Sequence, residues 1–418
     1  MPVVFHEKSG EFHLYNKNIS YIIKILPNNQ LGNLYFGKVI NDRESFSHLF
    51  QKKARSLLAY VFENDPAFSL QHTMQEYPSY GTTDFRIPAF EIRQKNGSRI
   101  SCFEYKKHEI FAGKNGLKGL PSTYVEEPED ADTLEITLYD ELIQTELVLS
   151  YTIFNSFPAI ARSARFENKG EDTVVLERAM SASIDFIDSD FEMIQLSGAW
   201  SRERHIKTRK LQQGIQGIFS MRGISSAEHN PFIALKRPNA DENCGEVYGF
   251  SLIYSGNHLE QVEVDTHNMT RVILGIHPDT FEWPLEKGEV FQTPEAILVY
   301  SDRGLNKMSQ TFHKLFSKHL ISRQWRNKIR PVLINSWEAT GANFTEEELL
   351  KMAEAAKELG IELFVLDDGW FGARDNDKAG LGDWNIVNRK KLPDGIAGLA
   401  DKIESMGMKF GLWIEPEC

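Results

Sequence analysis

The chain has 418 residues, with 59 acidic and 47 basic side chains and a formal net charge of -12. This length exceeds the usual size of a single hydrophobic core, so we expect at least two domains. The acidic balance disfavours nucleic acid and anionic membrane surfaces as partners, whereas neutral substrates remain open.

The first residues and the cysteines bear on where the protein resides. Residues 1–12 (MPVVFHEKSGEF) have neither the basic start nor the apolar core of a signal peptide. No apolar run approaches the length of a transmembrane helix. These features predict a cytoplasmic protein with no membrane partner. Cys102, Cys244 and Cys418 are widely spaced and odd in number, which argues against a disulfide framework or a zinc site and predicts buried free thiols.

Short strands and hairpins dominate residues 3–300. Asn96-Gly97, between the runs 91–93 and 99–105, predicts a type I′ hairpin because this pair tolerates the positive φ angles of that turn. Lys169-Gly170, between 165–168 and 173–176, repeats the pattern. Alternating apolar and polar residues predict further strands at 134–138, 147–154, 247–254, 262–264 and 271–274. Together these segments predict a large antiparallel β-sandwich.

Two polar and aromatic clusters interrupt the predicted strands. They span residues 76–86 (EYPSYGTTDFR) and 197–204 (SGAWSRER). For Trp200 in the second cluster, composition leaves two interpretations open. It is either part of an exposed recognition loop or a core tryptophan beside a solvated run of charges.

A helix is predicted around 305–323 and interpreted as a linker, because Met308, Phe312, Leu315, Phe316 and His319 follow helical spacing. Beyond it, strands and helices alternate. Strands are predicted at 331–335 (PVLIN), 361–366 (IELFVL) and 409–414 (KFGLWI). One intervening helix begins at the Thr345/Glu348 capping box and ends at Gly360, and the other carries Leu399, Ile403 and Met406 before Gly407. This alternation indicates a parallel sheet of the β/α-barrel kind.

Each of these three strands is followed by acidic or aromatic residues. They are Trp337 and Glu338, then Asp367 and Asp368, then Trp413, Glu415 and Glu417. Residues just past the strand ends of a β/α barrel face its active-site mouth, where carboxylates bind hydroxyls and indoles cover an apolar sugar face. An aspartate after a strand is often only a helix N-cap. The tandem Asp-Asp-Gly-Trp followed by Asp383-Trp384 favours a sugar site instead.

A complete barrel needs eight such strands, and the sequence supplies three. We therefore expect the chain to be a fragment of a longer enzyme, because an open parallel edge is a poor native end. The alternative is that residues 329–418 form a small, complete α/β appendage.

Eight short segments together resemble the α-galactosidases of glycoside hydrolase family 36. They are YGTTDFRIP (80–88), RSARFENKG (162–170), GAWSRER (198–204), FQTPE (291–295), NSWEA (335–339), LDDGWFG (366–372), LGDW (381–384) and LWIEPE (412–417). The resemblance implies a multidomain fold, β followed by α/β. An N-terminal β-supersandwich, galactose mutarotase-like, spans residues 1–303. A helical linker spans 304–328, and 329–418 begin a catalytic (β/α)8 TIM barrel that stops after about three strands.

The same resemblance implies roles for five residues. Asp367 and Asp368 look like the pair that hydrogen-bonds O4 and O6 of galactose, and Trp337 and Trp413 look like walls of the sugar pocket. Trp200 resembles a tryptophan that a sandwich loop contributes to the active site, from a neighbouring subunit in tetrameric members. Where some members offer an acidic residue to that pocket, this chain has Phe50, which bears on substrate length.

The resemblance further implies retaining hydrolysis of terminal α-galactosides, such as melibiose and raffinose-type oligosaccharides, without cofactor or metal. The nucleophile and acid/base aspartates lie on later barrel strands of the family, so we expect no catalytic residue within this chain. Glu415 and Glu417 share one face of a strand end, yet the resemblance gives them supporting roles.

Three alternatives stay open. The chain could be a noncatalytic sugar-binding or assembly module, a raffinose-synthase-like relative or an N-acetylgalactosaminidase. The compact segments FQTPE (291–295) and GAWSRER (198–204) favour the microbial-type hydrolase.

Overall fold

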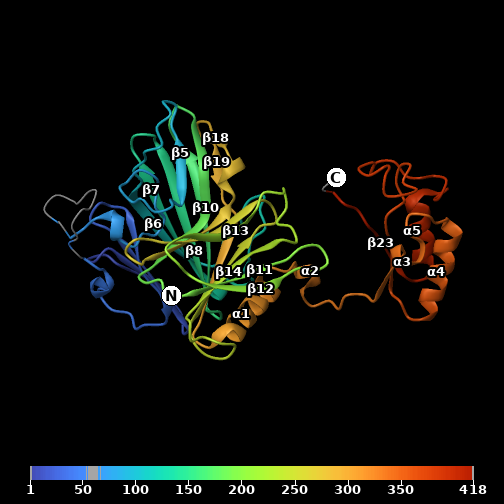
Figure 1. Ribbon diagram of the computed structural model, residues 1–418, viewed down its shortest axis with the longest axis horizontal. Coiled ribbons are helices and arrows are strands. Elements are labelled where there is room, and N and C mark those ends of the chain that lie inside the picture. The colour runs from blue at the N-terminus through green and yellow to red at the C-terminus, as the bar shows by residue number, and fades with distance from the viewer. Residues whose placement is uncertain (1, 53, 55–64, 66, 417–418) are drawn as a thin grey trace. The chain divides into compact units, whose positions relative to one another are not determined.

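The computed structural model describes residues 2–52, 54, 65 and 67–416. The chain forms two compact units, residues 1–321 and 322–418 (Figure 1). Each unit has its own hydrophobic core.

The first unit is built from antiparallel sheets. In its described residues, the first sheet has the order β1 (Val3–His6), β2 (Glu11–Tyr15), β3 (Ile19–Ile25) and β4 (Leu31–Lys38). The second has the order β13 (Gly214–Ser220), β16 (His258–Val264), β17 (Thr270–Ile276), β10 (Val174–Phe186) and β18 (Trp283–Leu285), with β5 (Phe90–Arg93) also on β10. The largest has the order β12 (His205–Lys210), β11 (Glu192–Ser197), β14 (His229–Lys236), β15 (Val247–Ile253), β20 (Glu295–Ser301), β9 (Ala159–Asn168), β8 (Thr145–Phe154), β7 (Ala131–Asp140) and β6 (Glu104–Ala112), with β19 (Val290–Gln292) also on β9. Short 3-10 turns occur at Ser47–Leu49, Leu70–His72, Pro128–Asp130 and Pro278–Thr280.

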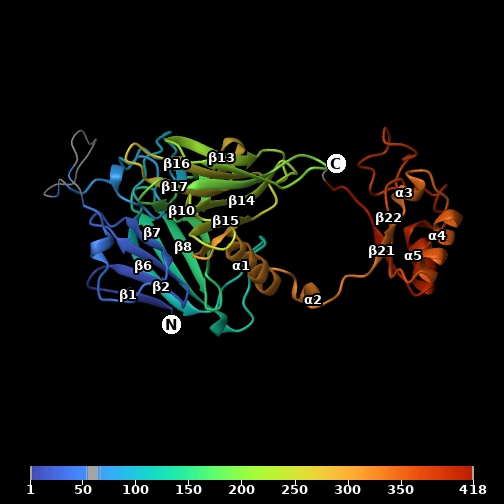
Figure 2. The same ribbon diagram turned by 60° about the horizontal axis from the view of Figure 1, so that its bottom comes forward.

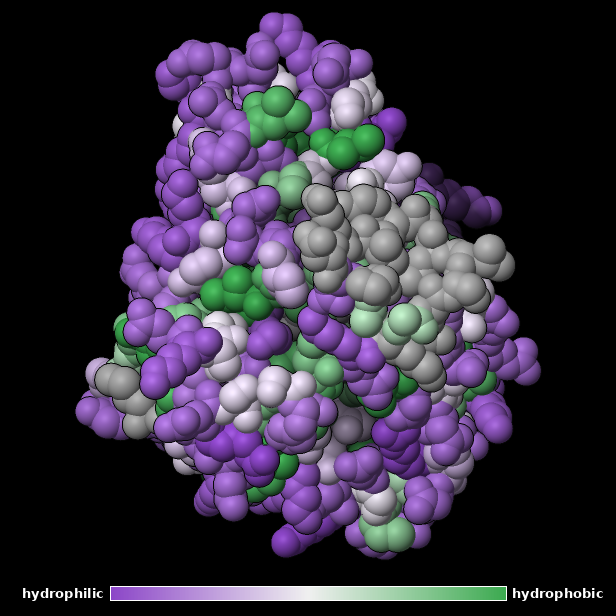
Figure 3. Space-filling view, turned by 90° about the vertical axis from the view of Figure 1, so that its left-hand side faces the viewer, coloured by the Kyte–Doolittle hydropathy of each residue, from purple (hydrophilic) through white to green (hydrophobic). Residues whose placement is uncertain are grey.

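One core joins these sheets. Ile184 of β10, Leu274 of β17, Phe250 of β15 and Leu298 of β20 belong to the same buried cluster, so the two larger sheets face each other across it. The four-stranded sheet lies against β6 and β7 (Figure 2), where Phe12 packs beside the ring of His108. Hydrophilic residues cover most of the face shown in Figure 3, with apolar residues scattered among them. The strands predicted from alternation at 134–138, 147–154, 247–254, 262–264 and 271–274 are all present.

Both predicted hairpins are wrong. Residues 94–98 do form a turn, in which the Gly97 N–H donates to the Gln94 oxygen, but β5 pairs with β10 and β6 pairs with β7. Likewise, β9 pairs with β8 while β10 pairs with β17, so the Lys169-Gly170 turn carries the chain from one layer to the other. A local turn sequence fixes a change of direction, whereas the strand partners are fixed by burial on each side of the core.

The helix predicted at 305–323 is α1 (Gly304–His319), and it packs on the first unit rather than spanning between units. Its buried residues Met308, Phe312 and Leu315 join Ile297 and Val299 of β20 in one cluster. The apolar stripe therefore serves as a packing face. The unit boundary falls after residue 321, inside the segment 304–328 that was interpreted as a linker. The short helix α2 (Arg323–Arg326) follows in the second unit.

The thiols differ from expectation. Cys102 and Cys244 are exposed, not buried, because each lies in a connection between strands. Cys418 lies outside the described residues. In the part of the chain that the structure describes, no helix is long and apolar enough to cross a membrane.

The second unit contains the predicted parallel sheet, β21 (Leu333–Asn335), β22 (Leu363–Leu366) and β23 (Lys409–Leu412). Short helix α3 (Trp337–Thr340) follows β21, α4 (Glu346–Glu358) precedes β22 and α5 (Gly395–Ser405) precedes β23. The Thr345/Glu348 capping box is confirmed. Phe364 and Leu366 of β22 are buried with Leu349 of α4 and Leu399 and Ile403 of α5, so the helices cover one face of the sheet.

Candidate functional site

The ends of the three parallel strands place most of the predicted site residues at one edge of the second unit. Asn335 lies opposite Val365, and Leu366 lies opposite Leu412, so the strands end in register. Trp337, the pair Asp367 and Asp368, and Trp413 come directly after these ends. The carboxyl edge of a parallel sheet is where ligands bind in α/β folds.

Asp367 is oriented by its strand neighbours. Its carboxylate accepts a hydrogen bond from Asn335 Nδ2 at 2.5 Å and from the backbone N–H of Asp368 at 2.7 Å. Its own backbone N–H donates to Ser336 Oγ at 3.1 Å. The contacts with Asn335 and Ser336 link the end of β21 to the end of β22, so the sheet itself helps to fix this carboxylate.

Asp368 is buried, with 6% of its surface exposed, and its carboxylate is bound by the guanidinium group of Arg374. Arg374 Nε lies 2.9 Å from Asp368 Oδ1, and Arg374 Nη2 lies 2.8 Å from Oδ2. Hydrogen bonding to Asp368 raises the pKa of Arg374 above its ordinary value. The two adjacent aspartates therefore have different surroundings. One is held by neutral donors and the other by a guanidinium fork.

Aromatic rings surround the strand ends. The Trp370 indole is buried and its Nε1 donates to the Trp413 oxygen at 3.0 Å. The Trp384 ring lies 5.9 Å from that of Trp413 and 4.4 Å from that of Phe371. Trp337, by contrast, is 42% exposed. An exposed indole offers an apolar plane that suits the apolar face of a sugar.

Trp200 lies in the other unit, in the loop between β11 and β12, which pair from Glu192 with Lys210 to Ser197 with His205. Its side chain is 87% exposed. The core interpretation of Trp200 is therefore wrong, and the predicted exposure of its loop is confirmed, whereas the recognition role stays a prediction. Phe50 is partly buried against Phe68, with ring centroids 6.2 Å apart.

The remaining predicted residues divide by exposure. Glu338 and Glu415 are exposed at the strand ends, whereas Glu417 lies outside the described residues. The structure also brings in four residues to which the sequence assigned no role, namely Asn335 and Ser336 of the NSWEA segment, Arg374 and Lys391. Asn335 and Ser336 could have been found from their place at the end of β21. Arg374 and Lys391 carry no such signal, because they reach the site through a long loop.

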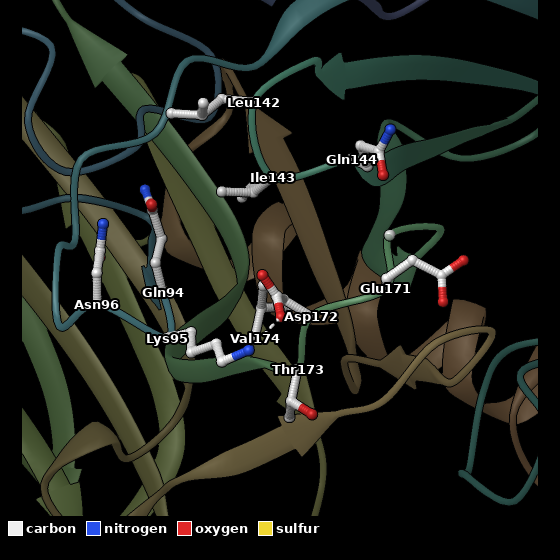
Figure 4. Close-up of a pocket in the computed structure, with 11 residues that line it drawn as sticks. Gln94, Lys95, Asn96, Leu142, Ile143, Gln144, Glu171, Asp172, Thr173 and Val174 are labelled. Atoms are coloured by element: carbon white, nitrogen blue, oxygen red, sulfur yellow. Dashed lines mark hydrogen bonds and ion pairs between the residues drawn. The ribbon is translucent and has the colours of Figure 1, made fainter.

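The first unit has an open cavity of about 390 Å3 among three connections, 94–96, 142–144 and 170–174 (Figure 4). Its wall is mostly polar and includes the ion pair between Lys95 Nζ and Asp172 Oδ1 at 2.7 Å. No aromatic ring is among the residues that line it, so it lacks the apolar plane of a sugar site. Among the described residues no group of three or more His, Cys, Asp or Glu is placed to hold a metal ion.

Two family models match the chain. Residues 29–286 match the glycosyl hydrolase family 36 N-terminal domain, and residues 290–418 match the melibiase family. The chain belongs to glycoside hydrolase family 36. The family match thus covers both units.

Several similar proteins are named α-galactosidases. The chain is 49% identical over 417 residues to α-galactosidase AgaA of Geobacillus stearothermophilus, covering 100% of this chain and 57% of that protein. It is 43% identical to α-galactosidase Mel36A of Lactobacillus acidophilus, covering 99% of this chain and 57% of the relative. The crystal structure of AgaB from G. stearothermophilus superposes with a TM-score of 0.94 at 50% identity, over 100% of this chain and 57% of that one. This family 36 chain therefore spans a little over half the length of these relatives.

Proposed function

We propose that this family 36 chain belongs to an α-galactosidase that hydrolyses terminal α-galactosides, such as melibiose and raffinose-type oligosaccharides, with retention of configuration. The observation that carries the proposal is the pair Asp367 and Asp368 directly after β22, the middle one of three parallel strands, with the exposed Trp337 just past the end of the neighbouring strand β21. A variant of the relative AgaA has been solved in complex with raffinose, which supports the substrate class.

The proposed binding chemistry follows from the carboxylates. Galactose differs from glucose in the axial direction of its O4 hydroxyl. A carboxylate fixed by Asn335 accepts a hydrogen bond from a hydroxyl in one direction, and the wrong epimer would not supply a donor in that direction. Trp337 and Trp413 would cover the apolar face of the ring.

For the architecture, we propose a β-supersandwich followed by the first three strands of a (β/α)8 barrel. The order strand, helix, strand in the second unit supports this, because parallel strands with helices on one face are the repeating unit of such barrels. The nucleophile and the acid/base would then lie on later strands and outside these residues. Retaining hydrolysis needs both carboxyl groups, so we propose that the 418-residue chain by itself binds galactosides at most weakly and turns none over.

We further propose that the complete protein is a homotetramer in which Trp200 reaches the pocket of a neighbouring copy. The support is the exposure of Trp200 at the tip of a hairpin whose backbone is fixed by six residue pairs. An exposed, rigidly presented indole is typical of contact surfaces.

The test compares the complete gene product that contains these residues with the 418-residue chain alone. Each is assayed on an aryl α-galactoside and on the matching α-glucoside, with product anomers followed by NMR. We expect the complete product to release α-galactose first and to reject the glucoside, and the chain alone to match a heat-inactivated control. A folded complete product without α-galactosidase activity would refute the function, and turnover by the chain alone would refute the proposed position of the catalytic carboxylates. Galactose binding by a complete product that lacks turnover would favour the noncatalytic sugar-binding module.

A further inference from the structure

Arg374 and Asp368 form a closed pair in the second unit. Arg374 Nε and Nη2 bind the two carboxylate oxygens at 2.9 and 2.8 Å, and the exposed fractions of the two side chains are 7% and 9%. The third nitrogen, Nη1, donates to the Ala379 oxygen at 3.2 Å. A bidentate fork fixes both the position and the plane of a carboxylate, which a single-point contact does not.

The segment between the two partners is itself held at both ends. Lys391 Nζ donates to the backbone oxygens of Gly369 at 3.0 Å and Arg374 at 2.6 Å. It also donates to the Ala342 oxygen at 2.7 Å. Because Gly369 directly follows Asp368, this ammonium group ties the residue after the carboxylate to the residue that binds it.

The chain turns sharply at Gly369, where φ is +104° and a Cβ atom would lie 2.7 Å from the Ala342 oxygen. Only glycine fits this approach without strain. The loop is therefore preorganised around Asp368 by a backbone turn, a lysine and a guanidinium fork.

The neighbouring carboxylate of Asp367 has a different set of hydrogen-bond donors. The hydrogen bonds to Asp367 described above come from an amide side chain and a backbone N–H, which are uncharged. The opposite charges of Asp368 and Arg374 cancel, whereas neither hydrogen-bond donor to Asp367 carries a charge. Each Asp368 oxygen accepts a hydrogen bond from Arg374, so only the remaining lone pairs of that oxygen can accept a hydrogen bond from a ligand.

We infer that Arg374 is a positioning residue for the galactoside site: it sets the direction in which Asp368 accepts hydrogen bonds from the sugar. This inference rests on the galactoside-binding role proposed above for Asp368. Arg374 has no contact with the sugar in this scheme and acts through Asp368 alone. The two aspartates are consequently not equivalent, since only Asp368 depends on a partner from the loop.

A double-mutant cycle in the complete gene product tests this. The variants are Arg374→Met, Arg374→Lys, Asp368→Asn and the double variant Asp368→Asn/Arg374→Met, each assayed for KM and kcat on an aryl α-galactoside and for inhibition by free galactose. Arg389→Met is the matched control, because Arg389 is an exposed arginine of the same loop that donates to the Pro393 oxygen.

We expect Arg374→Met to raise both KM and the galactose inhibition constant by about ten- to a hundredfold, with a smaller change in kcat, because misplacement of one contact group by about 1 Å has costs of this size. Arg374→Lys should lie between wild type and Arg374→Met. The double variant should bind galactose no worse than Asp368→Asn alone, since the two changes act on one contact. Removing both charges also keeps this variant free of an unpaired buried ion.

The outcomes separate the inference from the function. An active wild type, with Arg374→Met showing a lowered Tm but unchanged KM and galactose inhibition, would overturn the positioning role and leave the function intact. Additive losses in the double variant would also overturn it, because Arg374 would then act independently of Asp368. A folded wild type without activity on any α-galactoside would overturn both. Arg389→Met should match wild type, and a loss of affinity there would mean that any disturbance of the loop suffices, which contradicts the inference.

Discussion

Truncating Trp200 to alanine should change binding without changing stability. About one eighth of the Trp200 surface is buried, since its side chain is 87% exposed. A fully buried aromatic covers 150 to 250 Å2, so truncation here removes roughly 30 Å2 of contact, worth about 0.8 kcal/mol at 25 cal/mol per Å2. For a unit of this size the melting temperature should fall by no more than about 3 °C.

The assay measures Tm by calorimetry and KM on an aryl α-galactoside for Trp200→Ala in the complete gene product. If Trp200 reaches a neighbouring pocket, KM should rise, because a contact aromatic at an interface contributes on the order of 1 to 3 kcal/mol. Two control variants, one at a buried residue and one at an exposed residue, are measured in the same way. Phe250→Ala removes a fully buried ring of the same unit and should cost about 3 to 5 kcal/mol of stability. Ile206→Ala, 70% exposed on the adjoining strand β12, should alter neither quantity. A large Tm loss with unchanged KM for Trp200→Ala would refute the shared-pocket role.

Three further predictions concern the strand ends, a buried histidine and the thiols. Asp367→Asn and Asp368→Asn should each cost about 2 to 4 kcal/mol of transition-state binding, or about 30- to 1000-fold in kcat/KM, with a native circular dichroism spectrum; an unchanged kcat/KM would mean that the pair only caps the following loop. Burial lowers the pKa of His319 below its ordinary 6.5, so the unfolded chain takes up the proton first, and the stability contributed by neutral His319 is complete above about pH 6.5 and lost as the pH falls below it. Urea unfolding at about pH 7.5 and about pH 5.5 should therefore show an acid loss that His319→Gln reduces, and an equal loss in both proteins would contradict this. Native Cys102 and Cys244 are exposed and should both react with a thiol reagent, faster as the pH rises, because partial desolvation raises the pKa of the Cys102 thiol and the Asp241 hydrogen bond raises that of Cys244. Cys102→Ser and Cys244→Ser should each remove one reactive thiol.

Much of the second unit could be predicted from the sequence, because its signals are local. A capping box at Thr345 and Glu348, an apolar stripe and a closing glycine define a helix within a few turns, and all of them lie where the sequence indicates. The apolar run at 361–366 predicts a strand, and the residues after it are at the site edge by the rule for parallel sheets. A continuous apolar run predicts burial on both faces, but only Phe364 and Leu366 on the helix-covered face are buried. Thus the positions of Asp367, Asp368, Trp337 and Trp413 relative to their strands follow from the sequence.

Partners that are distant along the chain were decided only by the tertiary structure. Asn96-Gly97 and Lys169-Gly170 specify turns, yet β5 and β10 find their neighbours through the shared core. The apolar stripe on α1 indicates that this helix packs against other elements, but it does not identify the strands that it contacts. The residues next to Trp200 in the sequence are compatible with a buried or an exposed indole, and only the fold shows that it is exposed. Arg374 reaches Asp368 because Lys391 and the Gly369 turn close the loop. Local sequence thus determines elements and turns through short-range sterics and hydrogen bonds. The tertiary fold determines which charged and apolar groups meet, because only a complete core sets the position of each element.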